Sequence, residues 1–87
     1  MKYTKDPQAK LDYQIDWSSW LGSDTISIST WTVPSGITNA ADTNTTTAAT
    51  IWVSGGTLGE TYDLTNHIVT VGGREDDRTI RLVMSSR

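Results

Sequence analysis

The groups in this sequence that could take part in acid–base or metal chemistry are one histidine, His67, and a run of carboxylates near residue 75. His67 lies within a predicted strand, and there is no cysteine and no second histidine to share a metal ion or a proton with it. We therefore predict an edge or surface position for His67, with no catalytic role.

Glu75, Asp76 and Asp77 form an acidic cluster flanked by Arg74 and Arg78. These carboxylates are too close in sequence, and too exposed in a predicted hairpin tip, to act as the separated acid pair of a glycoside hydrolase. Two interpretations stay open. The segment is either a solvated turn with weak local ion pairs, or a tip that offers charged contacts to a partner protein.

The run Asp42 to Thr46 is similar to the start of a calcium-binding loop. It lacks the glycine required at the sixth position, where Thr47 stands, and the acidic ligand at the twelfth, where Val53 stands. Phosphate-binding loops, dinucleotide fingerprints and hydrolase elbows are also missing from the sequence. We predict that the chain is not an enzyme, with no catalytic residue, metal or cofactor.

Four tryptophans could form either a core or a sugar-stacking platform. Trp17, Trp31 and Trp52 lie inside predicted strands, so core packing is the favoured interpretation for them. Trp20 lies in a predicted turn among small residues and is the best candidate for an exposed aromatic anchor at a protein interface. The candidate interface therefore comprises Trp20, Arg74, Asp76, Asp77 and Arg78.

Short strands separated by turns must position these residues. Leu11, Tyr13, Ile15 and Trp17 alternate with polar residues, the period-2 pattern of a half-buried strand. Further strands are predicted at residues 25–33, 49–54, 64–71 and 78–84, with a polar edge strand and loop over 38–50 and turns at 18–24, 34–36, 55–56 and 72–77. No segment has a helical period, so the fold is predicted to be all-β.

Tyr62 favours one form of sandwich over a barrel. It stands at the entry to a late strand after a glycine-containing loop, where immunoglobulin-like domains place a tyrosine whose hydroxyl bonds back to the preceding connection. We therefore predict a small immunoglobulin-like β-sandwich of about seven short antiparallel strands.

The length of 87 residues suits one domain, which we place at 11–87. Residues 1–10 form a polar N-terminal arm, for which disorder in solution and ordering on assembly are both open. The net charge of −3 argues against nucleic-acid binding. No apolar run is long enough to span a membrane, and the first residues lack the apolar core of a secretory signal peptide, so we expect residence inside a cell.

Much of the chain resembles a family of small virion proteins, the phage fiber-tail adaptor proteins. The resemblance rests on Asp6-Pro7, Leu11-Asp12-Tyr13, Ile15-Asp16-Trp17-Ser18-x-Trp20-Leu21-Gly22-x-Asp24-Thr25-Ile26, Trp31-Thr32-Val33-Pro34-x-Gly36-Ile37, Trp52-Val53-Ser54-Gly55-Gly56-Thr57-x-Gly59-x-x-Tyr62-x-Leu64-Thr65-Asn66-x-Ile68 and Gly73-Arg74-x-Asp76-Asp77-Arg78-x-Ile80. The Thr/Asn run at 43–47 is not a family feature.

This resemblance implies a tail component of the virion, assembled in the host cytoplasm. Its partners would be other phage tail proteins (fibre, tail tube or adaptor ring) and copies of itself in a ring, with no nucleic acid and no membrane. A small cysteine-free sandwich gains stability from partners that bind its folded state, which suits such an assembly. Two alternatives stay open: a carbohydrate- or cell-surface-binding immunoglobulin-like module, and a capsid decoration or head-tail connector protein.

Overall fold

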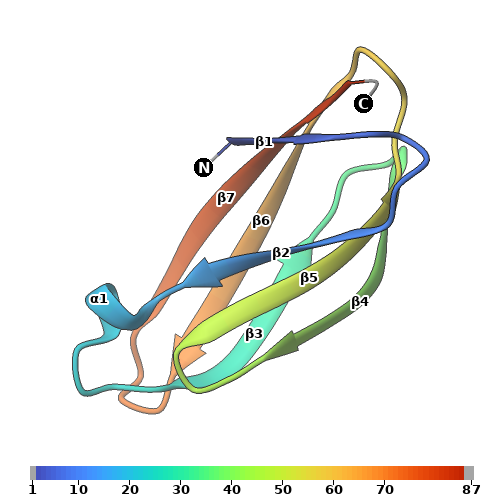
Figure 1. Cartoon of the computed structure of the whole chain (residues 1–87). Coiled ribbons are helices and arrows are strands. Elements are labelled where there is room, and N and C mark those ends of the chain that lie inside the picture. Colours follow the sequence, from blue (N-terminus) through green and yellow to red (C-terminus); the bar gives the residue numbers. More distant parts are fainter. Residues whose placement is uncertain (1, 86–87) are drawn as a thin grey trace.

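The computed structural model describes residues 2–85, which fold into two β-sheets packed face to face (Figure 1). The elements in this range are β1 (Lys2–Lys5), β2 (Leu11–Asp16), α1 (Ser18–Leu21), β3 (Ile26–Thr32), β4 (Ile37–Asn44), β5 (Ala48–Gly55), β6 (Thr61–Thr70) and β7 (Glu75–Met84). One sheet has the strand order β1-β7-β6-β3 and the other β2-β5-β4. The predicted all-β fold with seven strands is confirmed.

The strand order is consistent with an immunoglobulin-like form. In immunoglobulin domains strands C, F and G share one sheet and strands B, E and D share the other. Here β3-β6-β7 and β2-β5-β4 follow these two orders. One feature differs from the predicted antiparallel sandwich, because β1 lies parallel to β7 at the edge of the four-stranded sheet.

The predicted N-terminal arm includes β1 in this structure. Lys5, at the end of β1, is fully buried, and its Nζ donates hydrogen bonds to the carbonyl oxygens of Gly55 at 2.8 Å and Asp6 at 3.0 Å. These bonds satisfy a charge that would be costly to bury alone. They tie β1 to the end of β5 in the opposite sheet. The boundary between arm and domain stays a prediction, and Met1 lies outside the described residues.

The core lies between the sheets and is built from alternate residues of each strand. The prediction that Trp17 belongs to the core is confirmed, since its exposed fraction is 0%. Trp31 is half-buried and packs against the core. The other buried apolar residues are Tyr13, Ile15, Leu21, Ile26, Ile37, Ala49, Ile51, Val53, Tyr62, Leu64, Ile68, Ile80, Leu82 and Met84.

The prediction that Trp52 belongs to the core is wrong, because 40% of this residue is exposed. Its neighbours Ile51 and Val53 are both fully buried. Successive side chains of a strand point to opposite faces, so Trp52 must point to the solvent face of the three-stranded sheet.

The polar segment 38–50 includes all of β4 except Ile37, and β4 is an edge strand as predicted. The last three residues of the segment belong to β5, the central strand of the sheet. The hydrogen bond predicted for Tyr62 is confirmed, since its hydroxyl accepts the Thr57 amide at 3.1 Å. Two boundaries differ from prediction. The turn at 18–24 contains the one-turn helix α1, and the β6–β7 turn is shorter than 72–77, so that β7 begins at Glu75.

Candidate interface at the hairpin tip

The five residues predicted to form an interface divide into two groups around the β6–β7 hairpin tip. Trp20, Arg74 and Arg78 pack against one end of the sandwich. The helix α1 lies at the same end (Figure 1). Asp77 contacts His67 instead, and Asp76 is exposed. The structure therefore brings three of the five residues together in one cluster and leaves two acidic residues outside it.

The helix α1 places the two tryptophans of this cluster next to each other. The Asp16 carboxylate accepts the Ser18 amide at 2.9 Å at the start of the turn, and this hydrogen bond is the main cause of the lowered pKa of Asp16. The amide of Leu21 then donates to the Trp17 carbonyl at 2.9 Å. As a result the rings of Trp17 and Trp20 meet edge to face, with centroids 5.4 Å apart.

Arg74 holds the hairpin tip against α1. Its Nη2 donates to the Leu21 carbonyl at 2.8 Å, its Nη1 to the Trp20 carbonyl at 3.4 Å, and its Nε to Asp24 Oδ2 at 3.2 Å. The guanidinium carbon also lies 4.4 Å from the centre of the Trp20 ring. Carbonyls at the end of a helix have no hydrogen-bond donor within the helix. Arg74 is the donor for two of these carbonyls, those of Trp20 and Leu21. Arg74 is therefore part of the packed structure, and Trp20 beneath it is half-buried.

Asp24 is a central member of this cluster that the sequence reasoning missed. Hydrogen bonds from the Thr70 hydroxyl, from the amides of Thr25 and Gly72 and from Arg74 lower its pKa to about 2. A side chain at Gly72 would begin only 2.8 Å from Asp24 Oδ2, so any other residue here would have to displace the carboxylate from its hydrogen bonds. The only sequence signal was an Asp-Thr pair in a polar turn, a pattern typical of local capping.

Arg78 covers the core at the same end of the sandwich. Its guanidinium carbon lies 4.3 Å from the centre of the Trp17 ring, and its Nη1 donates to the Asp16 carbonyl at 3.2 Å. The side chain is half-buried. This one bond leaves the other three N–H groups on its two terminal nitrogens available as donors. We refer to Trp17, Trp20, Asp24, Arg74 and Arg78 together as the tip cluster.

Asp77 belongs to a second group on the outer face of the four-stranded sheet. His67 lies directly opposite Asp77 in the β6–β7 register; its Nδ1 contacts Asp77 Oδ1, and its Nε2 lies 2.9 Å from Glu75 Oε1. The predicted surface position of His67 is confirmed, with 41% of its side chain exposed. An edge position is ruled out, because β6 lies between β7 and β3. Asp76 points to the other face, and its Oδ1 accepts the Asp77 amide at 2.8 Å.

We expect the pKa of His67 to lie above its ordinary value of 6.5, because hydrogen bonds from the ring to Asp77 and then to Glu75 favour the charged imidazolium. The folded pKa is raised, so the stabilisation is fully present below pH 6.5 and is lost as the pH rises through the folded pKa. Both carboxylates are exposed, so salt will weaken the effect.

NMR titration of His67, the single histidine, measures this pKa directly. Asp77→Asn should lower the pKa more than Glu75→Gln, and Asp12→Asn on the opposite sheet should leave it unchanged. A wild-type pKa at or below 6.5 would contradict the bridged geometry.

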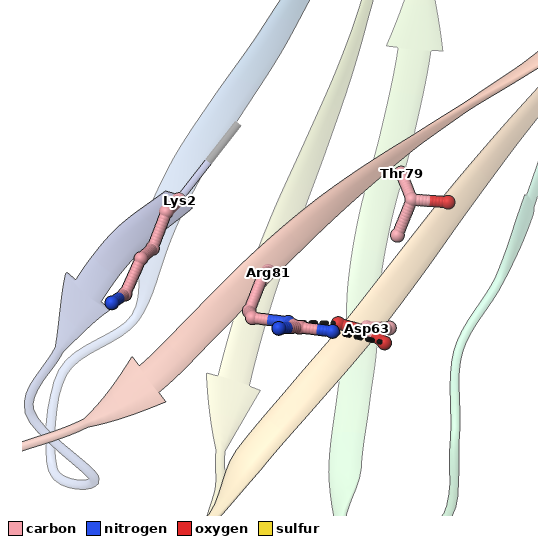
Figure 2. A pocket seen from close by; sticks show the side chains of 4 residues that line it. All are labelled: Lys2, Asp63, Thr79 and Arg81. Atoms are coloured by element: carbon pink, nitrogen blue, oxygen red, sulfur yellow. Dashed lines mark hydrogen bonds and ion pairs between the residues drawn. The ribbon is translucent and has the colours of Figure 1, made fainter.

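A shallow pocket of 330 Å³ lies on the same outer face, lined by Lys2, Asp63, Thr79 and Arg81 (Figure 2). Figure 2 shows Arg81 pointing to Asp63, while Lys2 stays apart from this pair. The Nε of Arg81 donates a hydrogen bond of 3.0 Å to Asp63 Oδ1. The pocket holds no nucleophile with an adjacent base.

Residues 2–85 contain no cluster of three or more acidic or histidine side chains suited to a metal ion. Nor do they contain a helix long and apolar enough to cross a membrane.

Fold and site together define a small β-sandwich protein with a compact, internally bonded tip. The model of the family described as the podophage GP4 fiber-tail adaptor protein gp77 matches residues 5–83. The chain therefore belongs to this family of structural phage adaptor proteins. No curated protein sequence matches the chain.

Proposed function

We propose that this chain is a non-enzymatic component of a tailed-phage virion that joins tail and fibre proteins through protein-protein contacts, in several copies. The observation that supports this most strongly is the family match over residues 5–83, nearly the whole chain. The partners in this proposal are proteins, since a net charge of −3 disfavours binding to nucleic acid or to anionic membranes.

The tip is the surface that we assign to a partner in the tail. The tip cluster is already bonded in the free chain, so its shape does not have to be organised on binding, which lowers the cost of association. Asp76 and Arg78 are charged groups at this end that form no close ion pair among the described side chains, and Arg78 has spare donors. We propose that they contact the partner, with Trp20 and Arg74 shaping the surface and Asp77 at its rim.

Mass spectrometry and electron microscopy of purified virions test the proposed role. We expect several copies of the chain at the tail, next to the fibres. Copies on the capsid would replace the adaptor role with capsid decoration, and copies at the neck would replace it with a connector role. Absence from the particles would overturn the proposal.

Charge reversal tests the assigned surface separately. Asp76→Lys should reduce the number of fibres per particle, whereas Asp42→Lys, the same change on the exposed edge strand β4, should leave it unchanged. Particles of the Asp76 variant with a full set of fibres would show that the partner binds elsewhere.

A sugar-binding role is a second candidate because Trp52 is exposed on the outer face of the three-stranded sheet, opposite Asp12 of β2. An aromatic ring beside a carboxylate is a common arrangement for stacking and hydrogen bonding to a pyranose ring. Glycan-array binding that Trp52→Ala abolishes would support this role, and an array without binding would exclude the glycans that it contains.

A further inference from the structure

The strand β3 is an edge strand with unusually little protection against pairing. It borders β6 on one side, and none of residues 2–85 forms a strand on its other side. Its sequence, ISISTWT, contains no charged residue and no proline. Charges and prolines are the usual features that prevent exposed edges from adding a further strand. One irregularity, between Ile26 and Ile28, affects only the start of the strand, and residues 28–32 are regularly paired with β6.

The other edge strands of the described fold differ from β3 in charge. β1 contains Lys2 and Lys5, β2 contains Asp12 and Asp16, and β4 contains Asp42. Two copies that met through β2 would bring like charges together, which is destabilising in paired strands. Of the four edge strands, only β3 carries no charged residue, so two identical copies can pair through it without bringing like charges together.

The side chains of β3 also leave apolar surface to bury. Ile28 is 54% exposed although it lies opposite Val69 of the neighbouring β6. Thr30 and Thr32, on the same face, are exposed as well. β-branched residues of this kind pack well across paired strands. A strand added next to β3 would therefore cover Ile28 and satisfy the outward-facing amides and carbonyls of this edge.

We infer that β3 pairs antiparallel with β3 of a second copy, so that the two four-stranded sheets form one continuous sheet across a twofold axis. A second copy fits because it brings a strand edge of the same length that also carries no charge. Each copy then provides hydrogen-bond partners for the unpaired amides and carbonyls of the other. The contact deepens the proposed multi-copy assembly and rests on it for a role in the virion. The pairing itself is a property of the isolated chain.

Sedimentation equilibrium of the purified chain tests the pairing. We expect a monomer–dimer equilibrium that Ile28→Lys weakens at least tenfold, because the variant places a lysine from each copy at the shared edge. Leu58→Lys is the matched control: Leu58 is 60% exposed in the loop between β5 and β6, and the change in charge is the same. A wild-type chain that stays monomeric, or equal weakening by both variants, would overturn the inference.

Cross-linking identifies the strand, because the natural chain has no cysteine. Single-cysteine variants at residues 28, 30 and 32, oxidised alone and in pairwise mixtures, should give a disulfide-linked dimer. Thr43→Cys on β4 should not. Cross-linking through residue 43 alone, or through none of these positions, would show that β3 does not face a second copy. That result would leave the tail location, tested in virions, unaffected.

Discussion

Replacing Asn66 with alanine is expected to lower the free energy of unfolding by about 2–4 kcal/mol. Asn66 is fully buried on β6, and its Oδ1 accepts the indole N–H of Trp17 at 2.9 Å. Its Nδ2 donates to Ser29 Oγ at 2.9 Å and to the Thr30 carbonyl at 3.0 Å. The alanine variant would leave the indole N–H of Trp17 buried without an acceptor, which is more costly than the loss of an exposed bond.

This network has a large effect because it joins the two sheets. Trp17 follows β2 of the three-stranded sheet, whereas Asn66, Ser29 and Thr30 belong to the four-stranded sheet. For a domain of this size the expected loss is a large fraction of a total stability of roughly 5–13 kcal/mol. Without the hydrogen bonds the sheets would be held together mainly by non-directional apolar packing.

Urea denaturation followed by circular dichroism measures the effect. Asn44→Ala is the matched control, since Asn44 is exposed and its Nδ2 bonds only the adjacent Thr45 carbonyl. A double-mutant cycle with Trp17→Phe isolates the bond between the two side chains and should give a coupling of about 1–3 kcal/mol. A loss for Asn66→Ala no larger than for Asn44→Ala would show that Trp17 finds another partner.

Local pattern was enough to predict much of the fold. The alternation of Leu11, Tyr13, Ile15 and Trp17 identified β2, and three of these four residues are buried. The pattern failed at Trp52 because Ile51, Trp52 and Val53 are apolar in succession, so the sequence does not show which face is inside. The register decides: Ile51 lies opposite the buried Tyr13, which places Trp52 on the other face.

Contacts across long sequence separations account for most of what was missed. Arg74 and Trp20 are 54 positions apart, and Trp17 and Asn66 are 49 apart. Their contacts depend on the packing of the two sheets and on α1, which is too short to give a periodic signal. The pairing of His67 with Asp77 depended on the exact turn, because a hairpin turn longer than the observed one places a different residue opposite His67.

Replacing Arg74 with alanine is expected to lower the free energy of unfolding by about 1–2 kcal/mol, less than Asn66→Ala because part of the side chain is exposed to solvent. Arg74→Lys should not restore the loss, since a single ammonium cannot bond the Trp20 and Leu21 carbonyls and Asp24 together. Arg81→Ala removes an exposed pair with Asp63 and should have a smaller effect. Denaturation curves test this order of stabilities. An Arg74→Lys variant with the same free energy of unfolding as the wild type would contradict it.

The same variants separate the two roles that the tip can have. If Arg74 only stabilises α1, then fibre attachment should fall in proportion to stability in both Arg74→Ala and Asn66→Ala. If the surface formed by Trp20 and Arg74 also contacts a tail protein, Arg74→Ala should lose more fibres per particle than Asn66→Ala, although it is the more stable of the two. The comparison works because Asn66 is fully buried and cannot touch a partner, whereas Arg74 is 46% exposed at the end of the sandwich.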